Sequence, residues 1–188
     1  MLVSRDVAAR MQVLTEFGVT GIFSARSIRI KSEYDRRLKA VSEHIDIMGF
    51  GLNALREDYG EQFTHWAQRA RVRILILDPE FPDNATSLAD QRDAEEKKPR
   101  GATRAEILQF VEHVRAMTSG QLEVRMYRCI PSVNVFRMDD ELFWGPYLIG
   151  EPSRSSPTFI VQRGGLLFDR MLRQFERIWT DYSRPIVE

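Results

Sequence analysis

The segment Val72–Leu77 constrains the fold of this 188-residue chain more than any other feature. Its residues are apolar apart from Arg73, and Asp78-Pro79 ends the run. Such a run is typical of a β-strand that is covered on both faces, as in a sheet packed between helices. A second short apolar segment followed by glycine predicts another strand, Ile45–Phe50. The chain is therefore expected to form a covered α/β sheet.

The other segments predict helices that alternate with strands. Apolar side chains at spacings of three and four predict helices over residues 4–17, 32–43, 59–70, 104–118 and 166–182. Short apolar or alternating runs predict further strands over residues 122–127, 134–138, 142–144 and 158–162. Alternation of strand and helix implies parallel βαβ connections, and the closely spaced later strands add an antiparallel part. The predicted fold class is mixed α/β, with a mostly parallel sheet and helices on both faces.

The length and composition indicate one domain over residues 1–188. Residues 80–104 carry many charges and few apolar side chains, which predicts a long surface loop with fraying helical turns. A loop of this length is either a functional lid or a solvated insertion. The 27 basic and 27 acidic residues give a formal net charge of zero, which counts against general nucleic-acid binding.

Several classes of protein are excluded by what the sequence lacks. Its single cysteine, Cys129, rules out a disulfide framework within one chain and a multi-cysteine zinc site. No apolar run reaches the roughly 18 residues of a membrane span, so a cytoplasmic protein is expected. The motifs of phosphate-binding loops, serine hydrolases and zinc proteases are absent, and the three histidines have no partner pattern. No metal or cofactor is predicted.

The densest group of polar residues lies on the later strands and turns, between residues 125 and 147. Its members are Arg125, Arg128, Ser132, Asn134, Arg137, Asp139, Asp140 and Tyr147. Two or three arginines near a sheet edge can hold a phosphate group through paired hydrogen bonds. The alternative is that the two aspartates form a turn and the arginines form surface salt bridges.

Four short segments carry a resemblance to a known family. They are Gly21–Arg26, Leu77-Asp78-Pro79, Pro131–Asp140 and Gly145–Tyr147. On these segments, residues 18–182 resemble one half of the phospholipase D-like superfamily, and more narrowly its bacterial members of poorly known function. The resemblance implies a phospholipase D-like half-domain. It also implies a homodimer, because active members of the superfamily bring two such motifs face to face.

Active members of the superfamily carry the motif His-x-Lys-x-x-x-x-Asp, in which the histidine attacks phosphorus and the lysine holds phosphate oxygens. If Asp139 takes the place of the family aspartate, Ser132 replaces the histidine and Asn134 replaces the lysine. A neutral serine is a poor nucleophile without an adjacent base. Loss of the lysine removes a positive charge from the phosphate clamp. The motif is therefore degenerate, and the phosphohistidine route is not expected.

Three functional hypotheses follow. The first is a non-catalytic module that binds a phosphorylated ligand such as a nucleotide, or acts as a sensor or scaffold in bacterial signalling or defence. Its ligand-binding candidates are Arg26, Asp78, Arg128, Asn134, Arg137 and Tyr147. The second is a phosphodiesterase or nuclease with a rebuilt site in a homodimer, with catalytic candidates Asp139, Asn134 and Ser132. The third is an interaction domain with a vestigial site. Its oligomer face would use Phe168, Phe175, Trp179, Tyr182 and Phe143-Trp144, although the sequence favours a place in the core for these residues.

Overall fold

Eight strands form one open sheet in the computed structural model, which describes residues 5–25, 28–115, 117 and 121–186. The strands are β1 (Val19–Phe23), β2 (His44–Gly49), β3 (Arg71–Leu77), β4 (Leu122–Tyr127), β5 (Val133–Met138), β6 (Glu141–Pro146), β7 (Thr158–Gln162) and β8 (Ser183–Pro185). The helices are α1 (Arg5–Phe17), α2 (Ile28–Ala40), α3 (Asn53–Tyr59), α4 (Phe63–Ala67), α5 (Leu88–Glu95), α6 (Ala102–Arg115) and α7 (Leu166–Asp181). Two 3₁₀ turns complete the order, η1 (Gly60–Gln62) and η2 (Ser153–Ser155).

The sheet has the strand order β1-β7-β6-β5-β2-β3-β4-β8. The mixed α/β class is confirmed, but the prediction of a mostly parallel sheet is wrong. Only β2–β3 and β3–β4 are parallel, and the other five pairs are antiparallel. The parallel strands are joined through helices, whereas β5, β6 and β7 follow one another through shorter connections. Two edge strands, β1 and β8, were not predicted because both are too short to show a pattern.

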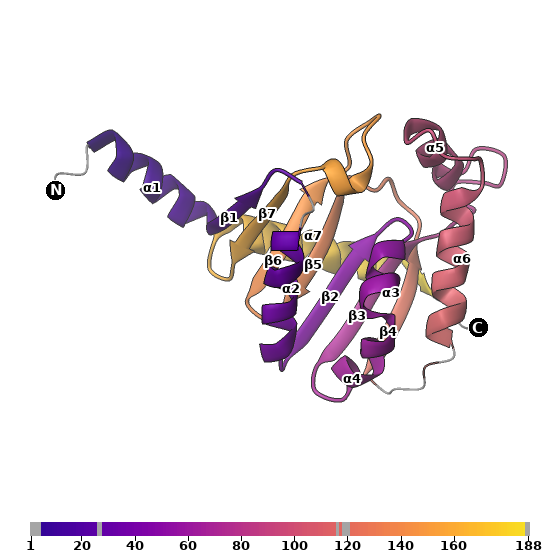
Figure 1. Cartoon of the computed structure of the whole chain (residues 1–188), viewed down its shortest axis with the longest axis horizontal. Helices are drawn as coiled ribbons and strands as arrows, with labels where there is room; N and C mark the ends of the chain where they lie inside the picture. The colour runs from indigo at the N-terminus through magenta and orange to yellow at the C-terminus, as the bar shows by residue number, and fades with distance from the viewer. Residues whose placement is uncertain (1–4, 26–27, 116, 118–120, 187–188) are drawn as a thin grey trace.

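Helices cover both faces of the sheet, as predicted. Figure 1 shows α2, α3, α4 and α6 in front of the sheet and α7 behind it. The front layer buries Trp66, Phe63 and Phe110 completely. The rear layer buries Phe168, Phe175 and Trp179 of α7. These three aromatic residues are therefore core and do not form an exposed oligomer face, whereas Tyr182 is 49% exposed.

The centre of the sheet carries a buried ionic network beneath α7. Asp46 of β2 is 1% exposed, and its two oxygens accept hydrogen bonds from Arg73 (2.7 Å) and Arg137 (2.9 Å). Arg73 also donates two hydrogen bonds to Glu176 of α7 and lies over the ring of Phe175. Burial lowers the pKa of Arg73, but its bonds to Glu176 and Asp46 raise it more. The network attaches α7 to the sheet, because two arginines of the sheet are neutralised by Asp46 of β2 and Glu176 of α7.

The prediction of a surface loop over residues 80–104 is wrong in its central part. This stretch contains α5 and the start of α6, and Ala89, Arg92 and Asp93 are almost fully buried. Ser87 begins α5 by accepting a hydrogen bond from the backbone N–H of Asp90 (3.1 Å), as a capping serine does. The segment is packed polar structure, and its charges are paired internally.

Helix α1 leaves the body of the domain. Figure 1 shows it extending away from the edge strand β1. The side chains of Val7, Met11, Val13 and Leu14 are all between 41% and 57% exposed. The amphipathic helix predicted here is present, but its apolar side chains are not buried. Among the residues that the structure describes, no helix is long and apolar enough to cross a membrane.

Candidate functional site

A cavity of about 490 Å³ opens at the carboxyl end of β2. We call it the carboxyl-end cavity. Its walls come from β2 and the loop that follows it, from α3, from the α5–α6 segment, from β5, and from the loop between β6 and β7. Open α/β sheets commonly bind ligands at the carboxyl ends of their strands. Of the candidate residues from the sequence, Asn134 and Tyr147 line this cavity.

One wall of the carboxyl-end cavity is apolar. It is formed by Ile47, Met48, Leu55, Val135 and Phe136. Beside this wall the rings of Phe50 and Tyr147 pack edge to face, with centroids 4.6 Å apart. The backbone N–H of Phe50 donates a hydrogen bond to the Tyr147 hydroxyl (3.2 Å). The aromatic pair is thus held in a fixed position, and a planar apolar group fits beside it.

The turn after β2 contains a residue with a positive φ, Leu52, whose side chain packs closely against Gly49. Leu52, which lines the cavity, has a φ of 53°, in the left-handed region that L-residues seldom adopt. A Cβ atom on Gly49 would lie only 2.5 Å from the Leu52 side chain. A larger residue at position 49 would therefore require the end of the Leu52 side chain to move. Strained residues of this kind cluster at binding and active sites.

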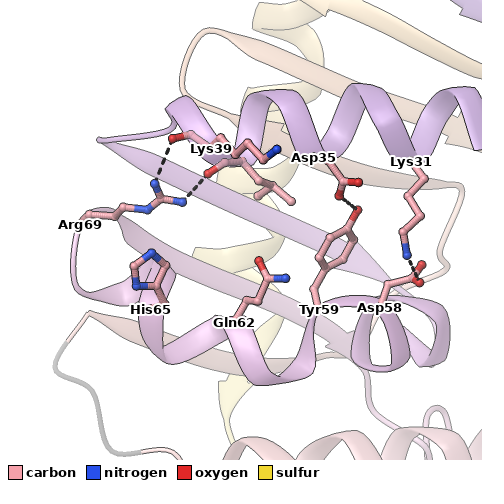
Figure 2. Close-up of a pocket in the computed structure, with 9 residues that line it drawn as sticks. Lys31, Asp35, Lys39, Asp58, Tyr59, Gln62, His65 and Arg69 are labelled. Atoms are coloured by element: carbon pink, nitrogen blue, oxygen red, sulfur yellow. Dashed lines mark hydrogen bonds and ion pairs between the residues drawn. The ribbon is translucent and has the colours of Figure 1, made fainter.

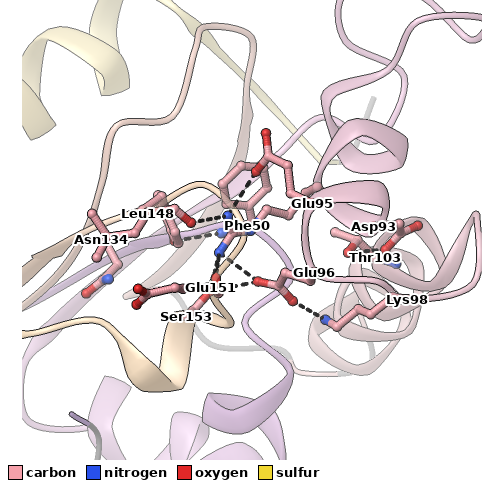
Figure 3. Close-up of polar contacts among 12 residues, drawn as sticks. Phe50, Asp93, Glu95, Glu96, Lys98, Thr103, Asn134, Leu148, Glu151 and Ser153 are labelled. Atoms are coloured by element: carbon pink, nitrogen blue, oxygen red, sulfur yellow. Dashed lines mark hydrogen bonds and ion pairs between the residues drawn. The ribbon is translucent and has the colours of Figure 1, made fainter.

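Arg92 joins the α5 segment to the loop between β6 and β7. Its guanidinium donates hydrogen bonds to the carbonyl oxygens of Leu148 (3.1 Å) and Glu151 (2.9 Å). It also forms an ion pair with Glu96 (2.7 Å) and lies over the rings of Phe50 and Tyr147. Figure 3 shows these polar contacts converging between the two segments. A single buried side chain thus holds the upper part of the cavity wall together.

Lys98 and Glu96 continue this network along the cavity. Lys98 pairs with Glu96 (2.9 Å) and with Glu106 (3.5 Å). Burial raises the pKa of Glu96, but Lys98 and Arg92 lower it more, so the net pKa lies below its ordinary value. Glu96 is therefore charged near pH 7 and is neutralised by Arg92 and Lys98.

Two polar side chains of the cavity have spare hydrogen-bonding capacity. Arg154 of η2 is exposed and forms no ion pair with any residue that the structure describes. Asn134 of β5 donates from its amide nitrogen to the carbonyl oxygen of Gly145 (3.2 Å). Its second amide hydrogen and its carbonyl oxygen are not used by that bond. Arg154 and Asn134 are the cavity groups best placed to meet a ligand.

The predicted site residues do not form one cluster. Of the ligand-binding candidates, Asn134 and Tyr147 line the carboxyl-end cavity. Arg137 points to the opposite face of the sheet, where it is 5% exposed and bound to Asp46. Arg26 lies outside the described residues. The expected single arginine-rich pocket is therefore absent from the described part of the chain, because alternation along β5 sends Asn134 and Arg137 to different faces.

Asp78 and Arg128 form a separate group at the carboxyl ends of β3 and β4. Asp78 is 1% exposed and pairs with Arg128 (2.9 Å) and Arg184 (3.0 Å). Arg128 also lies over the ring of Phe81. Nearby, burial raises the pKa of the Cys129 thiol, which disfavours the reactive thiolate. This arrangement ties the short edge strand β8 to the sheet.

The three catalytic candidates also lie apart. Ser132 is exposed just before β5, and its carbonyl oxygen accepts a hydrogen bond from the backbone N–H of Tyr147 (3.1 Å). Asp139 follows the other end of β5, beside the amino end of β2, because β5 and β2 are antiparallel. Its carboxylate accepts three backbone hydrogen bonds, from Ser42 (2.9 Å), Glu43 (2.9 Å) and His44 (2.8 Å). Asp139 thus caps the loop between α2 and β2.

The contacts of Asp139 predict a pH dependence of stability. Partial burial raises its pKa, but the backbone hydrogen bonds, led by that from His44, lower it more. A carboxylate with a depressed folded-state pKa stabilises the protein above its unfolded pKa of about 3.9, and that stability is lost as the pH falls through the folded pKa. Asp139→Asn is therefore expected to cost about 1–2 kcal/mol at pH 7 and progressively less below about pH 4.

Urea denaturation of both proteins between pH 3 and pH 8 measures this difference. Asparagine tolerates the left-handed conformation of residue 139 (φ 49°), so the substitution keeps the backbone and removes the charge together with one acceptor oxygen. The control is Asp140→Asn, because Asp140 and its partner Arg163 are both more than half exposed. A difference between wild type and Asp139→Asn that stays constant over the whole range would contradict the prediction.

The sequence did not single out the polar residues that shape the cavity most, Arg92, Lys98 and Arg154. The charge-rich stretch around residue 92 looked solvated. One signal was present: Ser87 and Asp90 have the spacing of a helix N-terminus before α5. Recognising that helix would have suggested that its polar side chains contact another segment of the protein, as Arg92 contacts the loop between β6 and β7.

The histidines do not supply a nucleophile to the cavity. His44 lies at the amino end of β2, and His113 of α6 packs edge-on against Phe63 with centroids 6.3 Å apart. His65 of α4 lines a different groove. Within the described residues, no group of three or more His, Cys, Asp or Glu side chains could hold a metal ion.

No protein-family model matches this sequence, and no curated protein matches it either. Several solved structures share its fold, two of which are the following. Phosphatidylserine synthase from Haemophilus influenzae Rd KW20 is similar over 96% of this chain, with a TM-score of 0.55 and 12% identity. TrmBL2, an archaeal chromatin protein whose structure shows a novel mode of DNA binding, is similar over 93% of this chain, with a TM-score of 0.51 and 12% identity.

This chain spans 46% of the phosphatidylserine synthase chain and 60% of the TrmBL2 chain. Phosphatidylserine synthase belongs to the phospholipase D superfamily. At 12% identity, these likenesses establish the fold alone.

Proposed function

We propose that this protein binds a phosphorylated small molecule, such as a nucleotide, in the carboxyl-end cavity without hydrolysing it by the phosphohistidine route. The observation that carries the proposal is the composition of the cavity. An apolar and aromatic wall faces polar groups from three separate segments, Asn134 of β5, Lys98 after α5 and Arg154 of η2. A cavity with an apolar body and a few converging polar groups is the usual form of a small-molecule site.

The charges of the cavity favour a phosphate group at one edge. Its basic side chains are Arg92, Lys98 and Arg154, and its acidic side chains are Glu57, Glu96 and Glu106. Arg92 and Lys98 neutralise Glu96, and Lys98 also lies near Glu106. Arg154 has no acidic partner among the described residues, and Glu57 accepts a hydrogen bond from Asn53 (2.9 Å) but has no basic partner there. A guanidinium can bind a phosphate through two parallel hydrogen bonds, so Arg154 is its principal partner.

The groups present favour binding over catalysis. Among the described residues that line the cavity there is no histidine or cysteine. Its hydroxyl groups belong to Thr103, Tyr147 and Ser153, and a hydroxyl needs an adjacent base to attack phosphorus. Thr103 already donates to Asp93 (2.6 Å). Ser153 donates weakly to Glu96 (3.4 Å), whose charge Arg92 and Lys98 stabilise.

The apolar wall supports a nucleotide over inorganic phosphate. Phe50 and Tyr147 offer an aromatic edge and face, on which a base can stack. The volume of about 490 Å³ is within the usual range for small-molecule sites. Both structural neighbours have names that involve phosphate-containing molecules, a phospholipid in one case and DNA in the other.

The test is isothermal titration calorimetry with the four ribonucleoside 5′-monophosphates, their parent nucleosides and glycerol phosphate. At least one nucleotide is expected to bind at least about tenfold more tightly than its nucleoside, because the phosphate adds a charge-assisted interaction. Arg154→Ala should remove most of that difference. Arg163→Ala is the matched control, since Arg163 is about half exposed and pairs with Asp140, away from the cavity.

Equal affinities for nucleotide and nucleoside would argue against phosphate recognition. Equal losses in both arginine variants would mean that only general surface charge matters. Binding of glycerol phosphate alone would redirect the proposal to a lipid headgroup.

The alternative of a rebuilt phosphodiesterase or nuclease is less well supported. It needs a nucleophile from outside the described cavity, which a second copy of the chain would have to supply. The homodimer implied by the family resemblance stays a prediction, and sedimentation equilibrium tests it. Cytoplasmic location and a role in signalling or defence also stay proposals.

A further inference from the structure

A second cavity lies on the other side of α3, away from the carboxyl-end cavity. It is a groove of about 510 Å³ between α2 and the segment from α3 to α4. We call it the α2–α4 groove. The buried Tyr59 forms part of it, and the hydroxyl of Tyr59 donates a hydrogen bond to Asp35 (2.7 Å). None of its lining residues lines the carboxyl-end cavity.

The charges of the α2–α4 groove are separated along its length. Figure 2 shows Lys31 and Asp58 paired at one end, with Arg69 and His65 at the other. That hydrogen bond raises the pKa of Lys31, so the Lys31–Asp58 end is a compensated pair. The groove as a whole has three basic side chains, Lys31, Lys39 and Arg69, against the two acidic ones. The excess positive charge therefore belongs to the end that holds Arg69.

Arg69 is held in place by the end of α2. Its two terminal nitrogens donate to the carbonyl oxygens of Leu38 and Lys39. These are among the last carbonyls of a helix, which have no partner within it. The guanidinium therefore stays at the end of the groove. A cation fixed by other contacts loses little conformational freedom when a ligand arrives.

Three donors of the groove remain available, His65 beside Arg69 and Lys39 and Gln62 nearer its middle. The side chains of Lys39, Gln62 and His65 line the groove, and none makes a hydrogen bond or ion pair with a side chain in the described ranges. Lys39 comes from α2, and Gln62 and His65 come from the neighbouring η1 and α4, so the fold brings α2 to a segment that follows it after β2 and α3. An ammonium, an amide and an imidazole can each donate to an oxyanion.

We infer that the α2–α4 groove is a binding site for a small oxyanion, a phosphate or carboxylate group, at its Arg69 end. Lys39 supplies the mobile charge, Gln62 and His65 supply directional hydrogen bonds, and Arg69 supplies a fixed positive field. The site is independent of the proposed nucleotide cavity. It gives the protein a place for a second, acidic ligand or for the acidic side chain of a partner.

The side-chain resonances of the histidines provide a direct readout. Inorganic phosphate and citrate are titrated separately at pH 7.5 and constant ionic strength, with chloride as the balancing anion. The ring signals of His65 are expected to shift in a saturable way, while those of His44 and His113 stay in place. Lys39→Gln should weaken the response about tenfold, the size of one charge-assisted hydrogen bond.

The matched control is Arg36→Gln, which removes one positive charge from the same helix. Arg36 is 65% exposed, pairs with Glu33 and does not line the groove. It should leave the His65 titration unchanged. The inference is overturned if His65 does not shift, if all three histidines shift together, or if the two variants weaken binding equally. Saturation by phosphate but not citrate, or the reverse, identifies which oxyanion the groove prefers.

Discussion

Replacing Asp46 with alanine is expected to lower the free energy of unfolding by about 3–5 kcal/mol, because breaking a buried ion pair leaves its partner uncompensated. Asp46 is 1% exposed and is the only carboxylate that contacts both Arg73 and Arg137 in the described structure. Arg73 would keep Glu176, but Arg137 would keep only its bond to the carbonyl oxygen of Asp139. Two guanidiniums would then share a low-dielectric region with one carboxylate.

Urea denaturation followed by circular dichroism measures this loss, with the slope of the transition checked for a change in the unfolding reaction. The control is Arg71→Ala, which removes an ion pair with Glu123 on the same sheet. Arg71 and Glu123 are each 48% exposed, and exposed pairs contribute about 0–1 kcal/mol. Similar losses in Asp46→Ala and Arg71→Ala would show that the buried network does not hold α7 in place.

Replacing Arg92 with alanine is expected to cost about 2–4 kcal/mol, because the buried Glu96 and two loop carbonyls lose their partner. Arg92 is 3% exposed and connects α5 to Leu148 and Glu151. Lys98 would still neutralise Glu96. The loop between β6 and β7 would lose its attachment to α5, so the wall of the carboxyl-end cavity should open.

Two measurements separate local opening of the loop between β6 and β7 from a loss of stability in the whole domain. Urea denaturation gives the total loss, and hydrogen–deuterium exchange should show the largest loss of protection in residues 147–154. Arg100→Ala is the control, since Arg100 is 74% exposed and pairs with Asp90 in the same segment. Unchanged exchange in residues 147–154 of Arg92→Ala would mean that Arg92 does not hold the loop.

Much of the fold could be predicted because its strands are strongly patterned. The strands at residues 122–127 and 158–162 have the predicted bounds, and β3 begins one residue earlier than predicted. Strand direction could not be predicted in the same way. The apolar pattern of β2 is the same whether its neighbour runs parallel, as β3 does, or antiparallel, as β5 does. Pairing of β2 with β5 depends on contacts between residues about 90 apart in the sequence.

The candidate site was predicted in part. Asn134 and Tyr147 do line the cavity. Arg137 and Asp139 were grouped with them because they are close in sequence, but an extended strand separates its two ends and its two faces. The contribution of Arg92 could not be foreseen. Its burial depends on a loop more than fifty residues further along the chain.

A change that fills the carboxyl-end cavity tests the central claim most directly. Ala54 is exposed on α3 and lines the cavity, so Ala54→Trp should occupy its space without disturbing the core. Ala105→Trp is the matched control, since Ala105 is exposed on α6 and does not line the cavity. The four ribonucleoside 5′-monophosphates are titrated into wild type and both variants by calorimetry. Binding by wild type and Ala105→Trp, with loss of binding in a folded Ala54→Trp, is the predicted result; full affinity in Ala54→Trp, or no binding to wild type, would contradict it.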